Sequence, residues 1–167
     1  MFLRKLYKRA IWLEAREFAW LGAGEVCGDV LRDFKTDNGT LSVWRVDESN
    51  MAHVIAALAS SGKKKKEEEF EMVLFSEDLL ETIGVRARQV DGNTPDAAAN
   101  TTWHFDIVEL TVTKVAELAT LLTQHGTLEQ RYQPEVKQFL KSSLSNYRLD
   151  ESLMAPELLI RLRRDPP

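Results

Sequence analysis

A strand followed directly by a helix, between Trp103 and Gly126, is the segment that most limits how this chain can fold. Its first part, WHFDIVEL, alternates large apolar residues with polar ones, which is typical of a strand with one buried face. Its second part, TVTKVAELATLLTQHG, repeats apolar residues at steps of three and four, as one face of a helix does. The segment therefore predicts a sheet with a helix packed back against it.

The ends of this helix carry recognisable signals. Thr111 is predicted to be the N-cap, since a threonine hydroxyl can accept a hydrogen bond from a free backbone N–H of the first turn. Gly126 is predicted to end the helix in the left-handed conformation that glycine favours. The predicted buried stripe between them consists of Val112, Val115, Ala116, Leu118, Ala119 and Leu122.

The remaining chain alternates predicted strands and helices. Strands are predicted at 40–47, 71–75, 85–90 and 156–167, helices at 2–21, 51–61, 77–83 and after Pro134, and a loop at 93–102. Because 167 residues is the length of one ordinary domain, we expect residues 1–167 to form a single globular domain. The interleaved pattern predicts an α+β fold, with a mixed sheet of about five strands flanked by helices.

Charge and cysteine content indicate the environment of the chain. The net charge is −4, from 22 basic and 26 acidic side chains, which argues against a general nucleic-acid-binding protein. The single cysteine, Cys27, excludes an intrachain disulfide and favours a reducing compartment. There is no leader-like apolar stretch and no run of about 18 apolar residues, so we expect a soluble, cytoplasmic protein without a membrane partner.

One pair of side chains has a spacing that suits chemistry. His104 and Asp106 are two residues apart on a predicted strand, so they project from the same face. A histidine beside a carboxylate can act as a general base in a small hydrolase or nuclease, with Arg86 or Arg88 holding an anion. The same pair also fits an ordinary solvent-facing strand.

Motifs for metals and cofactors are missing from the sequence. It has no H-E-x-x-H, no C-x-x-C pair and no phosphate-binding loop, and Cys27 stands where the dinucleotide fingerprint would need glycine. We therefore expect no metal and no cofactor, and we favour a non-catalytic role.

The N-terminal segment supplies the candidates for that role. Residues 1–21 are predicted to form a basic amphipathic docking helix, and tryptophan and arginine are enriched at binding hot spots. The candidate binding residues are Trp12, Arg16, Phe18 and Trp20. We expect a protein-binding or accessory subunit that associates with another protein or with itself. A weaker alternative is a nucleic-acid contact through the basic residues at 4–16 and 161–164.

Overall fold

The computed structural model describes residues 1–22, 24–61 and 68–164 of the chain. By its internal contacts the chain divides into two compact units, each assembled from three separate stretches. The first, here called the sheet unit, comprises 1–45, 71–88 and 105–130, and the second, the helical unit, comprises 46–70, 89–104 and 131–167. The single domain stays a prediction, because a division by contacts does not say whether either unit folds alone.

A six-stranded sheet forms the centre of the sheet unit, in the order β4-β5-β2-β1-β3-β6. The expected α+β class is confirmed, and the expected count of about five strands is close. The strands are β1 (Phe2–Lys5), β2 (Leu41–Arg45), β3 (Phe70–Phe75), β4 (Arg86–Gln89), β5 (His104–Val108) and β6 (Thr127–Arg131). Strand β1 pairs antiparallel with both β2 and β3, so that Phe2 lies opposite Arg45 on one side and Phe75 on the other.

The helix predicted over residues 1–21 is wrong, and the docking role of the segment stays a prediction. Residues 2–5 form strand β1 inside the sheet, and only Arg9–Ala15 form a helix, α1. Phe2 and Leu3 are both fully buried, as expected for a strand with neighbours on both edges. Two long-range strand partners outweigh the local helical periodicity here, because pairing and burial supply more free energy than intrinsic propensity does.

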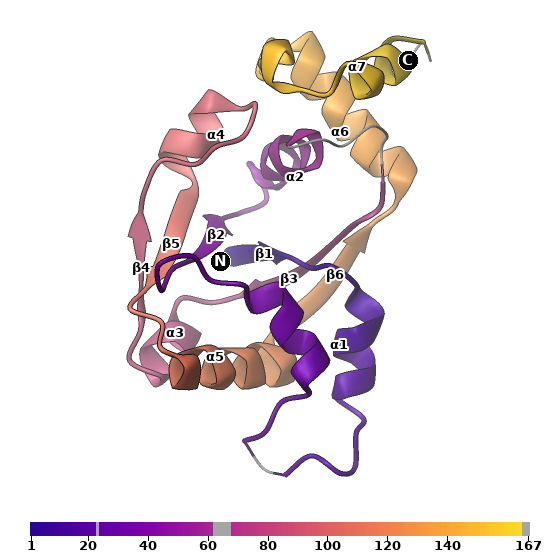
Figure 1. Ribbon diagram of the computed structural model, residues 1–167. Coiled ribbons are helices and arrows are strands. Elements are labelled where there is room, and N and C mark those ends of the chain that lie inside the picture. The colour runs from indigo at the N-terminus through magenta and orange to yellow at the C-terminus, as the bar shows by residue number, and fades with distance from the viewer. Residues whose placement is uncertain (23, 62–67, 165–167) are drawn as a thin grey trace. The chain divides into compact units, whose positions relative to one another are not determined.

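Helices of the sheet unit enclose its core. They are α1, the 3₁₀ segment η1 (Gly28–Phe34), α3 (Asp78–Thr82) and α5 (Val112–His125). Figure 1 shows α1 and α5 on the same side of the sheet. The core between the sheet and these helices includes Phe2, Trp12, Val30, Phe34, Leu41, Val43, Val73, Phe75, Phe105, Ile107, Leu118 and Leu122.

Helix α5 confirms most of its predicted features. The Thr111 hydroxyl accepts a hydrogen bond from the Lys114 N–H at 3.2 Å, as an N-cap should. Two details are wrong: Val112 is 89% exposed instead of buried, and Gly126 has φ of −70° instead of a left-handed value. Gly126 is needed for space, because a Cβ there would collide with Val73 Cγ2 and the Leu122 carbonyl oxygen.

The helical unit contains α2 (Met51–Ser60), α4 (Ala97–Thr102), α6 (Gln133–Ser145), the 3₁₀ segment η2 (Glu151–Leu153) and α7 (Pro156–Arg164). Helix α6 confirms the helix predicted at Pro134. Helix α4 lies inside the predicted loop and is capped by Asp96, whose carboxylate accepts from the Ala99 N–H at 2.9 Å. None of the helices in the described ranges is long and apolar enough to cross a membrane.

The strand predicted at 156–167 is also wrong, as far as the described residues reach. Residues 156–164 form α7, which buries Leu158 and Leu162. These two leucines are four residues apart and so share one helix face. The alternation of leucine and arginine in the same segment favours a strand and masks this helical spacing. A proline in the first turn and three arginines in the last turn, Arg161, Arg163 and Arg164, suit the two ends of a helix.

Candidate functional site

The segment between α1 and η1 folds back against the C-terminal half of α5, and together they form a pocket in the sheet unit. Hydrogen bonds between this segment and α5 fix the position of the segment. Arg16 donates through Nε to the Thr123 carbonyl at 2.5 Å and through Nη2 to the Gly126 carbonyl at 2.6 Å. Thr120 of α5 can donate its single hydroxyl proton either to the Gly24 carbonyl at 3.3 Å or to the Ala116 carbonyl of its own helix at 2.9 Å. The connecting segment is thus attached to α5 through Arg16, and Gly24 offers a second point of attachment.

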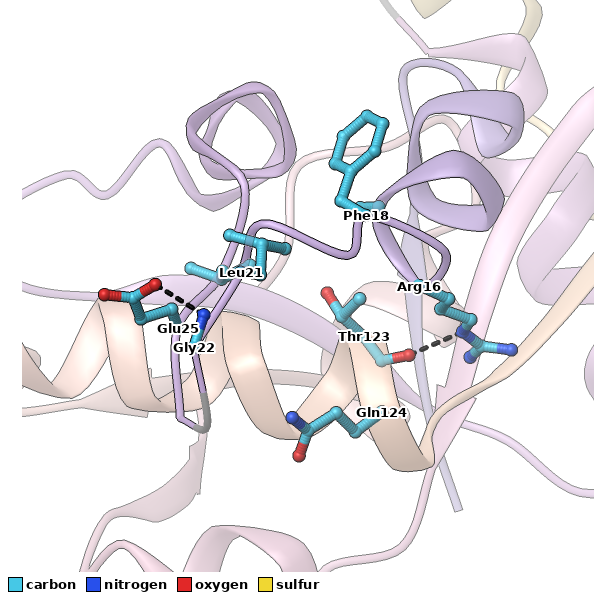
Figure 2. A pocket seen from close by; sticks show the side chains of 9 residues that line it. Arg16, Phe18, Leu21, Gly22, Glu25, Thr123 and Gln124 are labelled. Atoms are coloured by element: carbon cyan, nitrogen blue, oxygen red, sulfur yellow. Dashed lines mark hydrogen bonds between the residues drawn. The ribbon is translucent and has the colours of Figure 1, made fainter.

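The pocket has a volume of about 370 Å³, near the lower end of the ~300–1,000 Å³ typical of ligand pockets. It therefore has room for one or a few side chains. The lining residues are Ala15, Arg16, Phe18, Leu21, Gly22, Glu25, Val26, Thr123 and Gln124. Figure 2 shows Thr123 and Gln124 of α5 along one side, and Phe18 and Leu21 of the connecting segment along the other.

Opposite charges stand at the two ends of the pocket. Figure 2 shows Arg16 at one end and Glu25 at the other. Arg16 is an exposed residue that uses Nε and Nη2 on carbonyls of the α5 end, so its cation is held in place. Glu25 accepts the Gly22 N–H through Oε2 at 2.7 Å, which leaves Oε1 able to accept another hydrogen bond. The pocket therefore offers a fixed donor at one end and a fixed acceptor at the other.

An aromatic pair, Phe18 and Trp20, borders the pocket. Trp20 is 69% exposed, although tryptophan is one of the most apolar side chains. Its ring stacks on Phe18, a lining residue, with 5.4 Å between ring centroids and 24° between ring planes. We call the pocket together with Trp20 the pocket face.

Three of the four candidate binding residues near the N-terminus meet at the pocket face, namely Arg16, Phe18 and Trp20. Trp12 does not, because it lies in the core of the sheet unit. It is fully buried, donates its indole N–H to Asp33 Oδ2 at 2.8 Å and stacks on Phe34. Trp12 differs from the other three residues because it lies on the face of helix α1 that packs against the core, and the opposite face of the helix meets solvent.

The remaining pocket residues could not be selected from the sequence. Glu25, Thr123 and Gln124 belong to segments about 100 residues apart, and no local pattern joins them. The available signal was the occurrence of Phe18 and Trp20 in a short stretch that ends in glycines. Such a stretch rarely supplies enough apolar neighbours to bury both rings.

His104 and Asp106 lie on β5 as predicted. His104 is buried, and its Nδ1 lies 3.2 Å from the Val90 carbonyl oxygen. Asp106 is half-buried and accepts a hydrogen bond from the Ser42 hydroxyl at 3.0 Å. These contacts also suit structural roles, so the hydrolase or nuclease stays a prediction.

The two arginines proposed to hold an anion are both exposed on β4. Arg86 pairs with Glu109 at 3.1 Å, with both side chains largely in solvent, so this pair contributes little to stability. Across residues 1–22, 24–61 and 68–164, no group of three or more His, Cys, Asp or Glu side chains is placed to hold a metal ion.

The basic residues near the N-terminus are largely engaged within the sheet unit. Arg4 donates through Nε and Nη2 to the Asp33 carbonyl and through Nη1 to the Ser42 carbonyl. Burial lowers the pKa of Arg4, and the negative charge of Asp33 opposes that change. Arg4 therefore acts as an internal cross-link, which removes one cation from the proposed nucleic-acid contact.

A second polar cluster lies in the helical unit, around Trp103. Arg148 pairs through Nε with Asp96 at 3.2 Å, and its guanidinium carbon lies 5.4 Å from the centroid of the Trp103 ring. His53 stacks on the same tryptophan at 6.3 Å. Within the described residues, His53 Nδ1 and Arg148 Nη2 are buried without a hydrogen-bond partner.

The electrostatics of this cluster depend on His53. Burial and the nearby Arg148 cation lower its pKa, while Asp96 acts in the opposite direction. His53 is therefore neutral at neutral pH, and protonating it would place a second cation beside Arg148 in a partly buried site.

Comparison with models of protein families, with curated proteins and with solved structures finds no match for this chain.

Proposed function

We propose that this chain is a non-catalytic, protein-binding subunit and that its partner chain docks on the pocket face. The single observation that carries the proposal is the exposed Trp20, stacked on Phe18 at the edge of a pocket with fixed charges. Tryptophan and arginine are the residues most enriched at binding hot spots, because they combine a large apolar area with a polar group.

The exposed Trp20 ring carries a free-energy cost, because its apolar surface is in contact with water. A partner that covers the ring would remove this cost. An aromatic side chain buries 150–250 Å² when it is fully covered, worth about 25 cal/mol per Å². The stack on Phe18 and the anchoring of Arg16 on α5 hold the surface in one arrangement before a partner arrives. A surface ordered in advance loses less conformational entropy on binding, so more of the contact energy appears as affinity.

The test compares the Trp20→Ala variant with the wild-type protein, both at full length. A matched control is Tyr147→Ala, because Tyr147 is an aromatic residue 96% exposed in the helical unit. Each protein is immobilised and exposed to an extract of the source cells, and light scattering records its mass in solution. We expect Trp20→Ala to lose both captured protein and any self-association, and Tyr147→Ala to keep them. Equal association by all three proteins would refute the proposal.

A further inference from the structure

We infer that the partner chain of the pocket face is a second copy of this protein, related to the first by a two-fold axis. The inference rests on the proposed function and names the partner of the same surface. In a two-fold dimer both copies use the same patch, so the patch must be complementary to itself. The pocket face meets that condition in both shape and charge.

The shape argument concerns Trp20 and the pocket. The surface carries a projecting aromatic ring directly beside a hollow, since Phe18 both lines the pocket and stacks on Trp20. A two-fold rotation about an axis through the pocket places Trp20 of each copy against the rim of the other copy's pocket. The half-buried apolar side chains in the lining, Phe18, Leu21 and Val26, offer the indole an apolar contact.

The charge argument concerns the two ends of the pocket. Arg16 and Glu25 stand at opposite ends. A two-fold axis through the middle of the pocket brings Arg16 of one copy to Glu25 of the other, and the reverse pair follows by symmetry. Arg16 Nη1 and Glu25 Oε1 remain available for these contacts, because their other polar atoms are used within the chain. The dimer interface thus contains two equivalent ion pairs, and no side chain lies opposite a side chain of like charge.

Mass in solution tests the inference directly. Sedimentation equilibrium of the full-length chain, from about 1 µM to 1 mM, should show a monomer–dimer equilibrium. Trp20→Ala should raise the dimer dissociation constant by about 100-fold or more, since a hot-spot truncation costs over tenfold and the dimer contains it twice. Tyr147→Ala should leave the constant unchanged.

Two charge variants give a sharper test when they are mixed. Arg16→Glu alone places two glutamates opposite each other at both ends of the interface, and Glu25→Arg alone places two arginines there. Each variant should therefore be monomeric where the wild type is dimeric. An equimolar mixture restores opposite charges at both ends and should form a heterodimer.

Some outcomes would overturn the inference. A wild-type chain that is monomeric throughout the range, or dimers unaffected by Trp20→Ala, would contradict it. If the chain is monomeric but still captures another protein in a Trp20-dependent way, the two-fold dimer is wrong while the proposed function stands.

Arg16 also caps α5, so far-UV circular dichroism must show that Arg16→Glu is folded. If it is not, Glu25→Arg and Trp20→Ala decide the question, because both side chains are exposed.

Discussion

Trp12 donates its indole N–H to the carboxylate of Asp33 across 2.8 Å, inside the core of the sheet unit. The other oxygen of the same carboxylate accepts the Tyr7 backbone N–H at 2.7 Å. The Asp33 carbonyl accepts two hydrogen bonds from Arg4. One buried residue of η1 thus satisfies polar groups from β1, α1 and the turn between them, and it fixes where the chain leaves the sheet.

Replacing Asp33 by alanine should destabilise the protein strongly. The Trp12 indole would lose its acceptor in a buried environment, at about 1–3 kcal/mol, and the Tyr7 N–H would lose its acceptor in a partly buried one, at a smaller cost. We expect the free energy of unfolding in urea to fall by about 2–4 kcal/mol. Asp29→Ala, an exposed position on the same 3₁₀ segment, should change it by less than about 0.5 kcal/mol. Similar losses for the two variants would show that the buried carboxylate has no special role.

Stability should decrease in mild acid because of His53. Its pKa in the folded protein lies below the ordinary value of 6.5, so the unfolded chain takes up a proton first as the pH falls. Its contribution is therefore fully present above about pH 6.5 and is lost progressively below it, with a slope of at most ~1.4 kcal/mol per pH unit.

Urea denaturation at several values between pH 5 and pH 8 measures that slope. His53→Gln should flatten it, since glutamine has no proton to gain. His125→Gln, at an exposed histidine of α5, should leave it nearly unchanged. The explanation fails if His53→Gln retains the full slope of the wild type.

Gly126 should tolerate alanine poorly although its backbone angles suit any residue. The added methyl group would collide with Val73 of β3 and the Leu122 carbonyl, so strand and helix would have to move apart. Overpacking of this kind costs about 1–3 kcal/mol. Gly84 provides the opposite case, with φ of +65° and open space around its Cα, and alanine there should cost about 1 kcal/mol through backbone strain alone.

Thermal unfolding followed by circular dichroism compares the two glycine variants. A larger loss at Gly84 than at Gly126 would mean that the close contact between α5 and β3 can relax.

The sequence allowed prediction wherever local signals and long-range packing agree. Helix α5 has a cap at Thr111 and a stripe that includes Leu118 and Leu122, and both are present in the structure. Strand β6 was missed because its residues, TLEQR, contain one apolar side chain, and hydrogen bonding to a neighbouring strand at the sheet edge needs no apolar pattern. The sequence of α7 also predicts a strand, because a short run of leucines and arginines fits both the helical and the strand period.

The candidate site was predictable only in part, for a related physical reason. Arg16, Phe18 and Trp20 are close in sequence, so composition could identify them together. Their arrangement depends on Thr123 and Gly126, whose carbonyls hold the Arg16 guanidinium. Contacts between segments so far apart follow from the folded core and leave no mark on the local sequence.

The central place of β1 in the sheet has a consequence for the order in which the protein folds. Synthesis makes residues 2–5 before both of their neighbours in the sheet, residues 41–45 and 70–75. This strand therefore lacks its β2 partner until residues 41–45 have been made, and it lacks its β3 partner until residues 70–75 have been made. Because such long loops must close before their contacts form, we expect slow folding and a nascent β1 strand that needs protection from aggregation.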